Sequence, residues 1–294
     1  MQVNEIEYQN FKYYYRIYKN DNEELDPIFF ISGAFQNMDS WRLISNHFIS
    51  KTTVVVADLP GMGLADYLPE DYDTDFLVEA VYKILEEVSL ENVYMISASY
   101  GTILGYKFAK KYPEKISIMV LAGTMKELSQ QLKDRIIGSI DVAKKGETQE
   151  FAAYVLKNGL MYDGKDADEK INKFKFVKRV LNKQLSAFNK SEMDKYVSNS
   201  KRLLNESPID FIDVPSIKTL IFTGEYDVLT TPESCRNFAR KLKNSIFTTI
   251  KHADHLFHLE QPTIVIELFT RFGKGDNFDG IENCGEIEFF KASS

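Results

Sequence analysis

The sequence has few of the residues that disulfide frameworks and metal sites require. It contains two cysteines, Cys235 and Cys284, whose wide separation suggests no disulfide framework. Three of the four histidines, His252, His255 and His258, recur at every third position. That spacing places them on different sides of a strand or loop, and no cysteine or acidic ligand set accompanies them. We therefore expect no metal site, and nothing else in the chain points to a cofactor.

The chain also lacks long apolar runs and an excess of positive charge. No apolar stretch approaches the roughly 20 residues that cross a bilayer, so we expect no membrane span. The first residues lack the basic-then-apolar order of a signal peptide, which makes a cytoplasmic protein the expectation. A net charge of −7 argues against nucleic-acid binding as the main task. A hydrophobic content of 44% is that of an ordinary globular enzyme.

The positive charge of the chain is concentrated in one region. Residues 126–206 contain 17 Lys and Arg against 12 Asp and Glu, a balance of +5, which leaves −12 for the rest of the chain. A basic segment on an acidic body can attract an acidic partner. A solvated helical face rich in lysine explains the same composition without any partner, so both interpretations stay open.

Against this background, residues 96–101 (Ile-Ser-Ala-Ser-Tyr-Gly) carry the clearest chemical signal. A strand-like apolar run precedes them, and a helix-like segment, residues 102–112, follows. A serine on such a tight strand-to-helix turn has its hydroxyl pushed out above the edge of the sheet. The turn needs small residues two positions before and after the serine, and Ser97 and Gly101 meet that need. Ser99 is therefore the candidate nucleophile.

A serine hydroxyl is a weak nucleophile, so this hypothesis requires a base and an acid that orients the base. Residues 219–223 have the pattern of a buried strand, and Asp227 follows them. Residues 245–250 have the same pattern and lead into His255. Because the acid and the histidine each follow a strand, the sequence predicts a triad of Ser99, Asp227 and His255.

Strand and helix patterns alternate through the first part of the chain, which predicts an α/β fold with a mostly parallel sheet and helices on both faces. The expected strands are residues 3–8, 11–18, 27–32, 53–58, 92–97 and 116–122, and the expected helices are residues 41–49 and 75–88. From there to residue 215 helical apolar spacing replaces the strand pattern, with runs at residues 150–160, 170–188 and 192–204. This segment is expected to be a helical cap inserted over Ser99.

These motifs resemble those of the α/β-hydrolase superfamily. The chain order Ser, Asp, His matches, as do Asp58-Leu-Pro-Gly-Met-Gly63 after a strand and the stretch from His255 to Gln261-Pro262. The resemblance covers residues 11–125 and 211–272.

The resemblance also implies a domain organisation. A core made of residues 1–125 and 211–272 would carry a cap, residues 126–210, and a C-terminal extension, residues 273–294. Gly and Asp in the extension suggest a turn-rich segment with one short strand at residues 286–290.

The superfamily stabilises a developing oxyanion with backbone N–H groups. Many members have His-Gly where this chain has Ser32-Gly33-Ala34-Phe35. Because the role needs a backbone N–H rather than a histidine ring, Ala34 or Phe35 can supply it beside Tyr100. The departure from the common pattern leaves open which of the two N–H groups is used.

A narrower resemblance is carried by Ser32-Gly-Ala34, by residues 96–101 and by the stretch from Thr223 to Thr231. These short matches are similar to the synthases that join two 3-hydroxyacyl chains into the lipid precursor of rhamnolipids. That group uses acyl-carrier-protein thioesters, so the resemblance implies an acyl carrier protein as a partner.

The sequence thus predicts a serine-dependent acyl enzyme, an esterase or thioesterase acting on a small-molecule ester or thioester. An acyltransferase that joins 3-hydroxyacyl groups would use the same covalent intermediate, and halide or peroxide chemistry without a cofactor would use the same triad. The competing class is a small-molecule binding protein on the same fold. Apolar residues that can line a pocket in the cap are Phe151, Tyr154, Leu160, Met161, Phe174, Phe176, Leu181 and Phe188.

Overall fold

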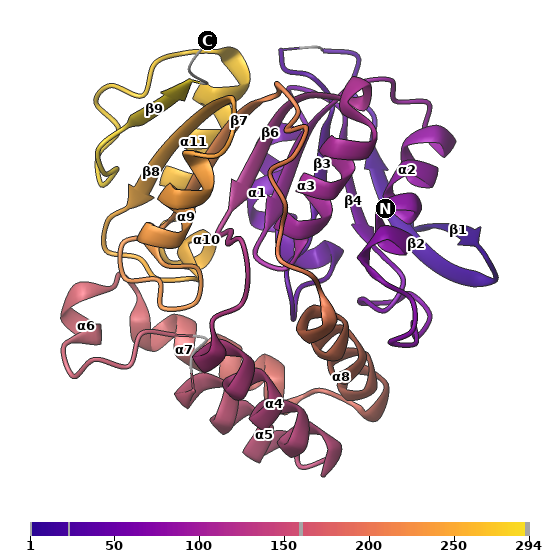
Figure 1. Cartoon of the computed structure of the whole chain (residues 1–294), viewed down its shortest axis with the longest axis vertical. Coiled ribbons are helices and arrows are strands. Elements are labelled where there is room, and N and C mark those ends of the chain that lie inside the picture. The colour runs from indigo at the N-terminus through magenta and orange to yellow at the C-terminus, as the bar shows by residue number, and fades with distance from the viewer. Residues whose placement is uncertain (1, 23, 159–160, 292–294) are drawn as a thin grey trace.

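A computed structural model of the chain describes residues 2–22, 24–158 and 161–291 (Figure 1). Its centre is a sheet with the strand order β1-β2-β4-β3-β5-β6-β7-β8-β9. The strands are β1 (Asn4–Tyr8), β2 (Phe11–Tyr18), β3 (Ile28–Ile31), β4 (Val54–Asp58), β5 (Val93–Ala98), β6 (Ile116–Ala122), β7 (Lys218–Gly224), β8 (Asn244–Ile250) and β9 (Glu288–Lys291). Strands β3 to β8 pair in parallel, whereas β1, β2 and β9 are antiparallel additions at the edges.

The parallel strands are short apolar runs because both of their faces are covered. Every residue of β4 and β5 is buried, as expected for strands between two layers of helices. Side chains alternate between the faces: Val55 and Ala57 belong to one apolar cluster, and Val54 and Val56 to the other. The core therefore consists of two layers, one on each side of the sheet.

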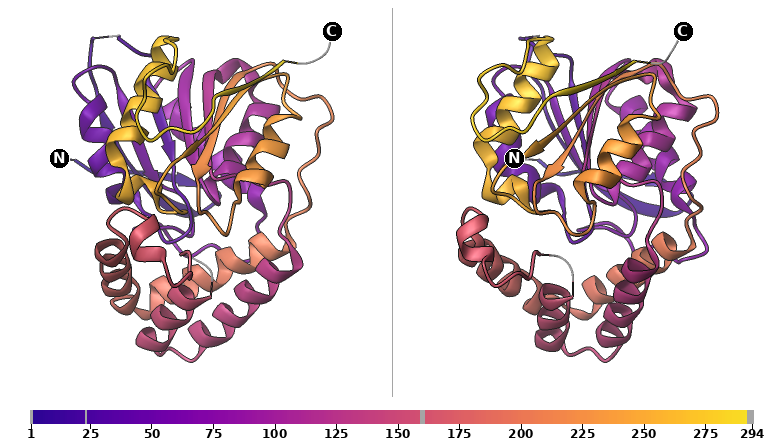
Figure 2. Two further views of the ribbon diagram at one scale, coloured as in Figure 1. Left: turned by 90° about the vertical axis from the view of Figure 1, so that its left-hand side faces the viewer. Right: turned by 60° about the vertical axis from the view of Figure 1, so that its left-hand side comes forward.

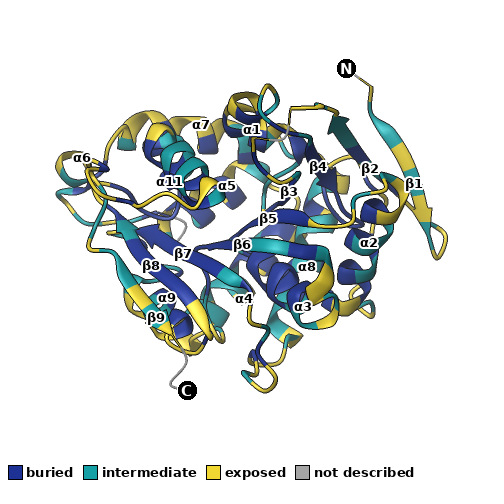
Figure 3. Ribbon diagram, turned by 90° about the horizontal axis from the view of Figure 1, so that it is seen from above, coloured by how far each residue is buried: buried dark blue, intermediate teal, exposed yellow. Residues whose placement is uncertain are grey.

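Helices cover both faces of the sheet, as Figure 3 shows. Helices α1 (Arg42–Phe48) and α11 (Pro262–Lys274) pack on one face. Helices α2 (Thr74–Glu87), α3 (Gly101–Lys111) and α9 (Pro232–Ala239) pack on the other. The predicted mostly parallel sheet with helices on both faces is confirmed.

An inserted helical cap lies between β6 and β7 in the chain and below the sheet as drawn in Figures 1 and 2. Its helices are α4 (Gln130–Lys144), α5 (Thr148–Lys157), α6 (Ala167–Lys170), α7 (Phe174–Ser186) and α8 (Lys190–Asn205). The cap has an apolar cluster of its own around Phe151, Leu185 and Met193. The expected cap is confirmed, but α4 was absent from the predicted helices, and of the run at residues 170–188 the structure forms one helix, α7, at residues 174–186.

The last part of the described chain returns to the sheet. Strand β9 pairs antiparallel with β8, with Phe290 opposite Ser245, and confirms the short strand expected near residues 286–290. None of the helices in the described parts of the chain has the length and apolar character needed to span a membrane.

Candidate active site

Ser99 occupies a sharp turn between β5 and α3. Its φ of 50° lies in the left-handed region, which a residue with a side chain adopts only under constraint. The constraint comes from both sides: the Ser99 N–H donates to the Ala122 carbonyl at 2.8 Å, and the Thr102 N–H donates to the Ser99 carbonyl at 2.8 Å. A Cβ on Gly101 would lie 2.6 Å from the carbonyl oxygen of Ser32. The small residue that the sequence pattern required is therefore needed for close packing of the turn.

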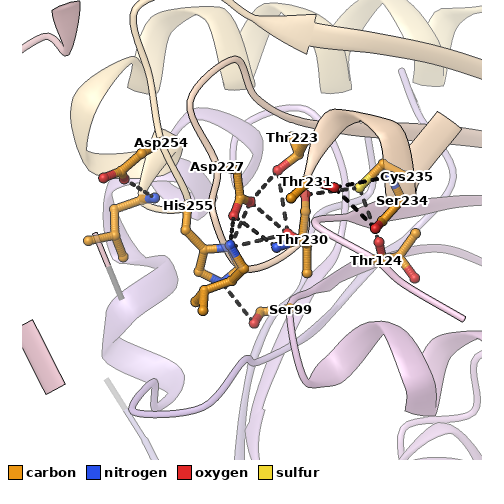
Figure 4. A network of polar contacts seen from close by, with 12 residues as sticks. Ser99, Thr124, Thr223, Asp227, Thr230, Thr231, Ser234, Cys235, Asp254 and His255 are labelled. Carbon is orange, nitrogen blue, oxygen red and sulfur yellow. Dashed lines mark hydrogen bonds and ion pairs between the residues drawn. The ribbon is translucent and has the colours of Figure 1, made fainter. Parts of the chain in front are cut away.

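The structure brings the three predicted triad residues together at the carboxyl edge of the sheet (Figure 4). Asp227 follows β7 and His255 follows β8, neighbouring parallel strands whose carboxyl ends meet at that edge. His255 Nε2 lies 2.9 Å from Ser99 Oγ, and His255 Nδ1 lies 2.8 Å from Asp227 Oδ2. The hydroxyl, the imidazole and the carboxylate thus form one continuous hydrogen-bonded chain.

Asp227 is buried and well supplied with hydrogen-bond donors. Its Oδ1 accepts from the N–H groups of Leu229 at 2.8 Å and Thr230 at 2.9 Å. Its Oδ2 accepts from the Thr230 hydroxyl at 2.6 Å and from the Thr223 hydroxyl. Burial opposes the charged form, but the charge of His255 and these hydrogen bonds outweigh it and lower the pKa of Asp227 to about 2. The carboxylate is therefore ionised at neutral pH.

His255 is buried next to this carboxylate. Burial favours the neutral ring, but the negative charge of Asp227 and its hydrogen bond outweigh burial, so the pKa of His255 is raised above its usual value. An ionised carboxylate can only accept hydrogen bonds, so Nδ1 of the neutral ring must carry the hydrogen and donate it to Asp227. Nε2 is then unprotonated and can accept the Ser99 proton. The tautomer that a general base needs is thus the one that Asp227 selects.

The predicted oxyanion residues lie on two turns beside the serine. Ala34, Phe35 and Tyr100 line the same cavity as Ser99. A Cβ on Gly33 would lie 3.1 Å from the Ser99 Cβ, so the first turn approaches the serine closely. Within the described residues, the backbone N–H groups of Ala34, Phe35 and Tyr100 have no hydrogen-bond acceptor. They can therefore donate to a bound oxygen.

A cavity of about 630 Å³ separates the cap from Ser99 and His255. Much of its cap side is apolar, including Leu132 and Ile136 of α4. Polar side chains of the cap, including Arg135 and Ser139, also line it. A concave site with apolar walls and a few polar groups is typical of small-molecule binding. Of the residues predicted to line it, Tyr154 and Leu181 do so.

Other apolar residues of the cap have different surroundings. Phe151 and Phe188 belong to the cap cluster, where both also pack near Phe35. Met161 and Phe174 pack in a second small cluster around Leu181, and Phe176 is exposed on α7. Leu160 lies outside the described residues.

The three regularly spaced histidines do not converge. His252 Nδ1 lies 3.2 Å from the Lys170 carbonyl oxygen, whereas His255 faces Asp227. Across residues 2–22, 24–158 and 161–291, no group of three or more His, Cys, Asp and Glu side chains is arranged to hold a metal ion. His258 is half-buried and lies in the cavity wall with Gln36.

Comparison with known proteins agrees with this architecture. A family model described as alpha/beta hydrolase fold matches residues 26–262. A proline iminopeptidase of Pestalotiopsis fici is 22% identical over 198 residues, which is 60% of this chain and 65% of that protein. The chain therefore spans about two thirds of that relative's length.

Solved structures resemble the chain over nearly their whole length. MGS-M2, an alpha/beta hydrolase enzyme from a Medee basin deep-sea metagenome library, has a TM-score of 0.79 at 23% identity and covers 93% of this chain and 98% of its own. A thermophilic esterase from Thermogutta terrifontis has a TM-score of 0.75 at 18% identity, and the match covers 92% of this chain and 98% of the esterase. At these identities the likeness is one of fold.

Proposed function

Because this chain belongs to the alpha/beta hydrolase fold family, we propose that it is a serine-dependent acyl enzyme that hydrolyses an ester or thioester of a small molecule. The observation that carries the proposal is the hydrogen-bonded chain from Ser99 Oγ through His255 to Asp227, with distances of 2.9 and 2.8 Å. Ser99 and apolar side chains of the cap line the same cavity, which supports an acyl group as the part of the substrate that is bound there.

In the first half of the reaction, Ser99 Oγ attacks the carbonyl carbon while His255 Nε2 takes the hydroxyl proton. The carbonyl oxygen becomes an oxyanion, which the Tyr100 N–H and the N–H of Ala34 or Phe35 stabilise. Asp227 holds the ring and stabilises its charged form. The intermediate then collapses, the bond to the leaving group breaks, and His255 returns the proton to the leaving oxygen or sulfur.

In the second half, water takes the place of the serine as nucleophile. His255, neutral again, accepts a proton from the water as its oxygen attacks the acyl carbon. Collapse of this intermediate breaks the bond to Ser99 Oγ, which recovers its proton from His255 and releases a carboxylic acid. The same groups therefore serve both half-reactions, and no additional cofactor is needed.

The similar proteins support an acyl-group reaction without fixing the leaving group. One solved neighbour is an esterase, and one relative is named as a proline iminopeptidase. We favour an ester or thioester here because the cavity side of the cap is largely apolar around Leu132, Ile136 and Leu181. No charged group of the described cap is paired with the triad.

A burst experiment tests this function. With an activated aryl ester, the first turnover should release about one equivalent of the aryl alcohol per enzyme before a slower steady rate, because acylation precedes deacylation. The Ser99→Ala variant should show neither phase. A protein that binds the ester without releasing the alcohol would contradict the proposal and would favour a non-catalytic binding protein on this fold.

A second candidate is acyl transfer from acyl-carrier-protein thioesters, and the exposed basic face of α7 favours it. Lys173, Lys178 and Arg179 are exposed there, whereas the nearby Lys175 pairs with Asp168. Reversing the charges of Lys178 and Arg179 should slow the use of carrier-protein thioesters and spare small esters, with a difference that shrinks at high salt. An unchanged ratio of the two rates would leave hydrolysis of small esters as the better account.

A further inference from the structure

The turn that carries Ala34 and Phe35 is held in place by two glutamine side chains, one on each side. On the core side, the Gly33 N–H donates to Gln36 Oε1 at 2.7 Å. On the cap side, Gln184 Nε2 of α7 donates to the Phe35 carbonyl at 2.8 Å. Phe35 has a φ of 63°, so the turn adopts a conformation that an unsupported segment would rarely keep.

These contacts determine the orientation of the Gln36 amide. A backbone N–H is only a donor, so the atom that faces Gly33 must be the amide oxygen. The amide nitrogen then faces His258, where the distance between Gln36 Nε2 and His258 Nε2 is 3.4 Å. Because an amide nitrogen only donates, His258 Nε2 must be the acceptor, and the ring must be neutral with its hydrogen on Nδ1.

The surroundings of His258 favour this neutral form. Burial and the neighbouring His255 lower the pKa of His258 to about 4, so the ring remains an acceptor well below neutral pH. His258 belongs to the short helix α10 (Phe257–Glu260), which begins two residues after His255. The contact between His258 and Gln36 therefore joins the loop of the general base to the turn that carries the oxyanion donors.

We propose that Gln36 and His258 are positioning residues that fix the turn carrying Ala34 and Phe35 relative to Ser99 and His255. The inference rests on the proposed function, because it assigns a role to that turn in stabilising the oxyanion. Both side chains act through the Gly33 backbone rather than by contact with the reacting atoms. Their contact connects two segments of the chain that lie 222 residues apart in the sequence.

The expected effect is on the chemical step rather than on substrate binding. A backbone donor stabilises an oxyanion only when it points at the oxygen, and removal of one such donor lowers kcat by about 10² to 10³-fold. Loss of the Gln36 amide leaves the N–H groups in place but frees the turn. We therefore expect Gln36→Met to lower kcat by about 10 to 10²-fold with little change in KM.

The partner residue provides the critical comparison. His258→Phe removes the acceptor and should lower kcat to a similar degree, whereas His258→Gln keeps an acceptor oxygen and should retain most of the activity. Because both changes break the same bridge, the double variant Gln36→Met with His258→Phe should be little worse than either single variant. Gln130→Met, at an exposed position of α4, is the matched control and should leave kcat unchanged.

The measurement is kcat and KM on one ester for these five variants, together with inhibition by an alkyl boronic acid, whose serine adduct places an oxygen in the oxyanion site. Boronic acid affinity should fall in parallel with kcat. A rise in KM at constant kcat, independent effects that multiply in the double variant, or an inactive but folded His258→Gln would each overturn the inference. Full activity in Ser99→Ala would instead overturn the proposed function, so the two failures are distinguishable.

Discussion

The two walls of the cavity are built from different kinds of contact. On the sheet side, the carboxylate of Asp227 is fixed by backbone N–H groups, by threonine hydroxyls and by His255. On the cap side, Leu132, Tyr154 and Leu181 offer mostly apolar surface. The cap also makes hydrogen bonds to the loops at this edge. Gln184 donates to the Phe35 carbonyl, and the Tyr162 N–H donates to the Asp254 carboxylate next to His255. We therefore expect substitutions on the sheet side to change the rate of the chemical step, and substitutions in the cap to change which substrates are preferred.

The largest effect is expected at the centre of the sheet side. Ser99→Ala should lower kcat by 10³-fold or more, on the order of losses seen for other triad nucleophiles. The variant should unfold at nearly the same temperature as the parent protein, because the change removes one hydroxyl from a turn that backbone hydrogen bonds hold. Thermal unfolding followed by circular dichroism and steady-state rates on the same esters give both numbers. Retention of most activity on every ester would show that the site is misassigned.

Asp227→Asn should have the next largest effect, a loss of kcat of about 10⁴-fold at most that stays smaller than the loss in Ser99→Ala, because the amide no longer selects the required tautomer of His255. In the parent, activity should rise with pH as His255 loses its proton, and its raised pKa places this rise above the usual value of about 6.5. The asparagine removes the negative charge that raises the pKa, so the residual activity should rise at lower pH. Rate profiles for both proteins check the shift, and an unmoved profile would remove His255 as the titrating base.

A change in the cap should alter selectivity with a smaller effect on the chemical step. Leu181→Trp fills part of the cavity and should reduce kcat/KM for long acyl esters by about tenfold relative to acetate or butyrate esters, since one misfitted side chain is worth a few kcal/mol at most. Phe176→Trp, exposed on the same helix, is the matched control. A series of ester chain lengths is the measurement. An equal loss at every chain length would place Leu181 outside the acyl site.

The smallest effect is expected where the cap touches the sheet side. Gln184→Met removes the hydrogen bond to the Phe35 carbonyl, and one such bond contributes about 1 kcal/mol. We expect a fewfold decrease of kcat, smaller than that of Gln36→Met, because the core-side bond to Gly33 remains. Steady-state rates on a short ester check this, and an effect larger than that of Gln36→Met would mean that the cap, rather than the core, positions the turn.

Much of the sheet side could be predicted from the sequence because its signals are local. A strand buried on both faces must be an apolar run, so the run at residues 53–58 predicted β4 closely. The turn around Ser99 needs Gly101 to pass the Ser32 carbonyl, and that need appears directly as a small residue in the sequence. Chain order then placed Asp227 and His255 at the ends of neighbouring strands.

The cap was predicted less completely because packing between helices decides its details. Helix α4 buries few residues, Ser139, Ile140 and Ala143, so its apolar period is weak and it was not predicted. Phe151 and Tyr154 lie on the same helix and are both aromatic, yet the first packs within the cap and the second faces the cavity. The way α5 packs against the neighbouring helices decides which of the two side chains faces the cavity, and the sequence pattern of α5 alone does not contain that information.

The long-range polar contacts were missed for the same reason. Gln36 belongs to no motif that the sequence offered, and the matching stretch from His255 to Pro262 contains His258 without indicating its partner, because the contact spans 222 positions. The threonines around Asp227 are part of the motif that carries the narrower resemblance, but the motif did not indicate what their side chains do. Their donation to the carboxylate becomes evident once β7 and the following turn are folded together.

Intact-mass analysis of the enzyme during turnover tests the covalent intermediate on Ser99 most directly. Rapid acid quenching with an activated ester should give a mass increase equal to one acyl group, and peptide mapping should place that group on Ser99. The Ser99→Ala variant should give no adduct, and Asp227→Asn should give the same adduct more slowly. Turnover without any adduct under conditions of rapid acylation, or an acyl group on another residue that persists in Ser99→Ala, would contradict the account.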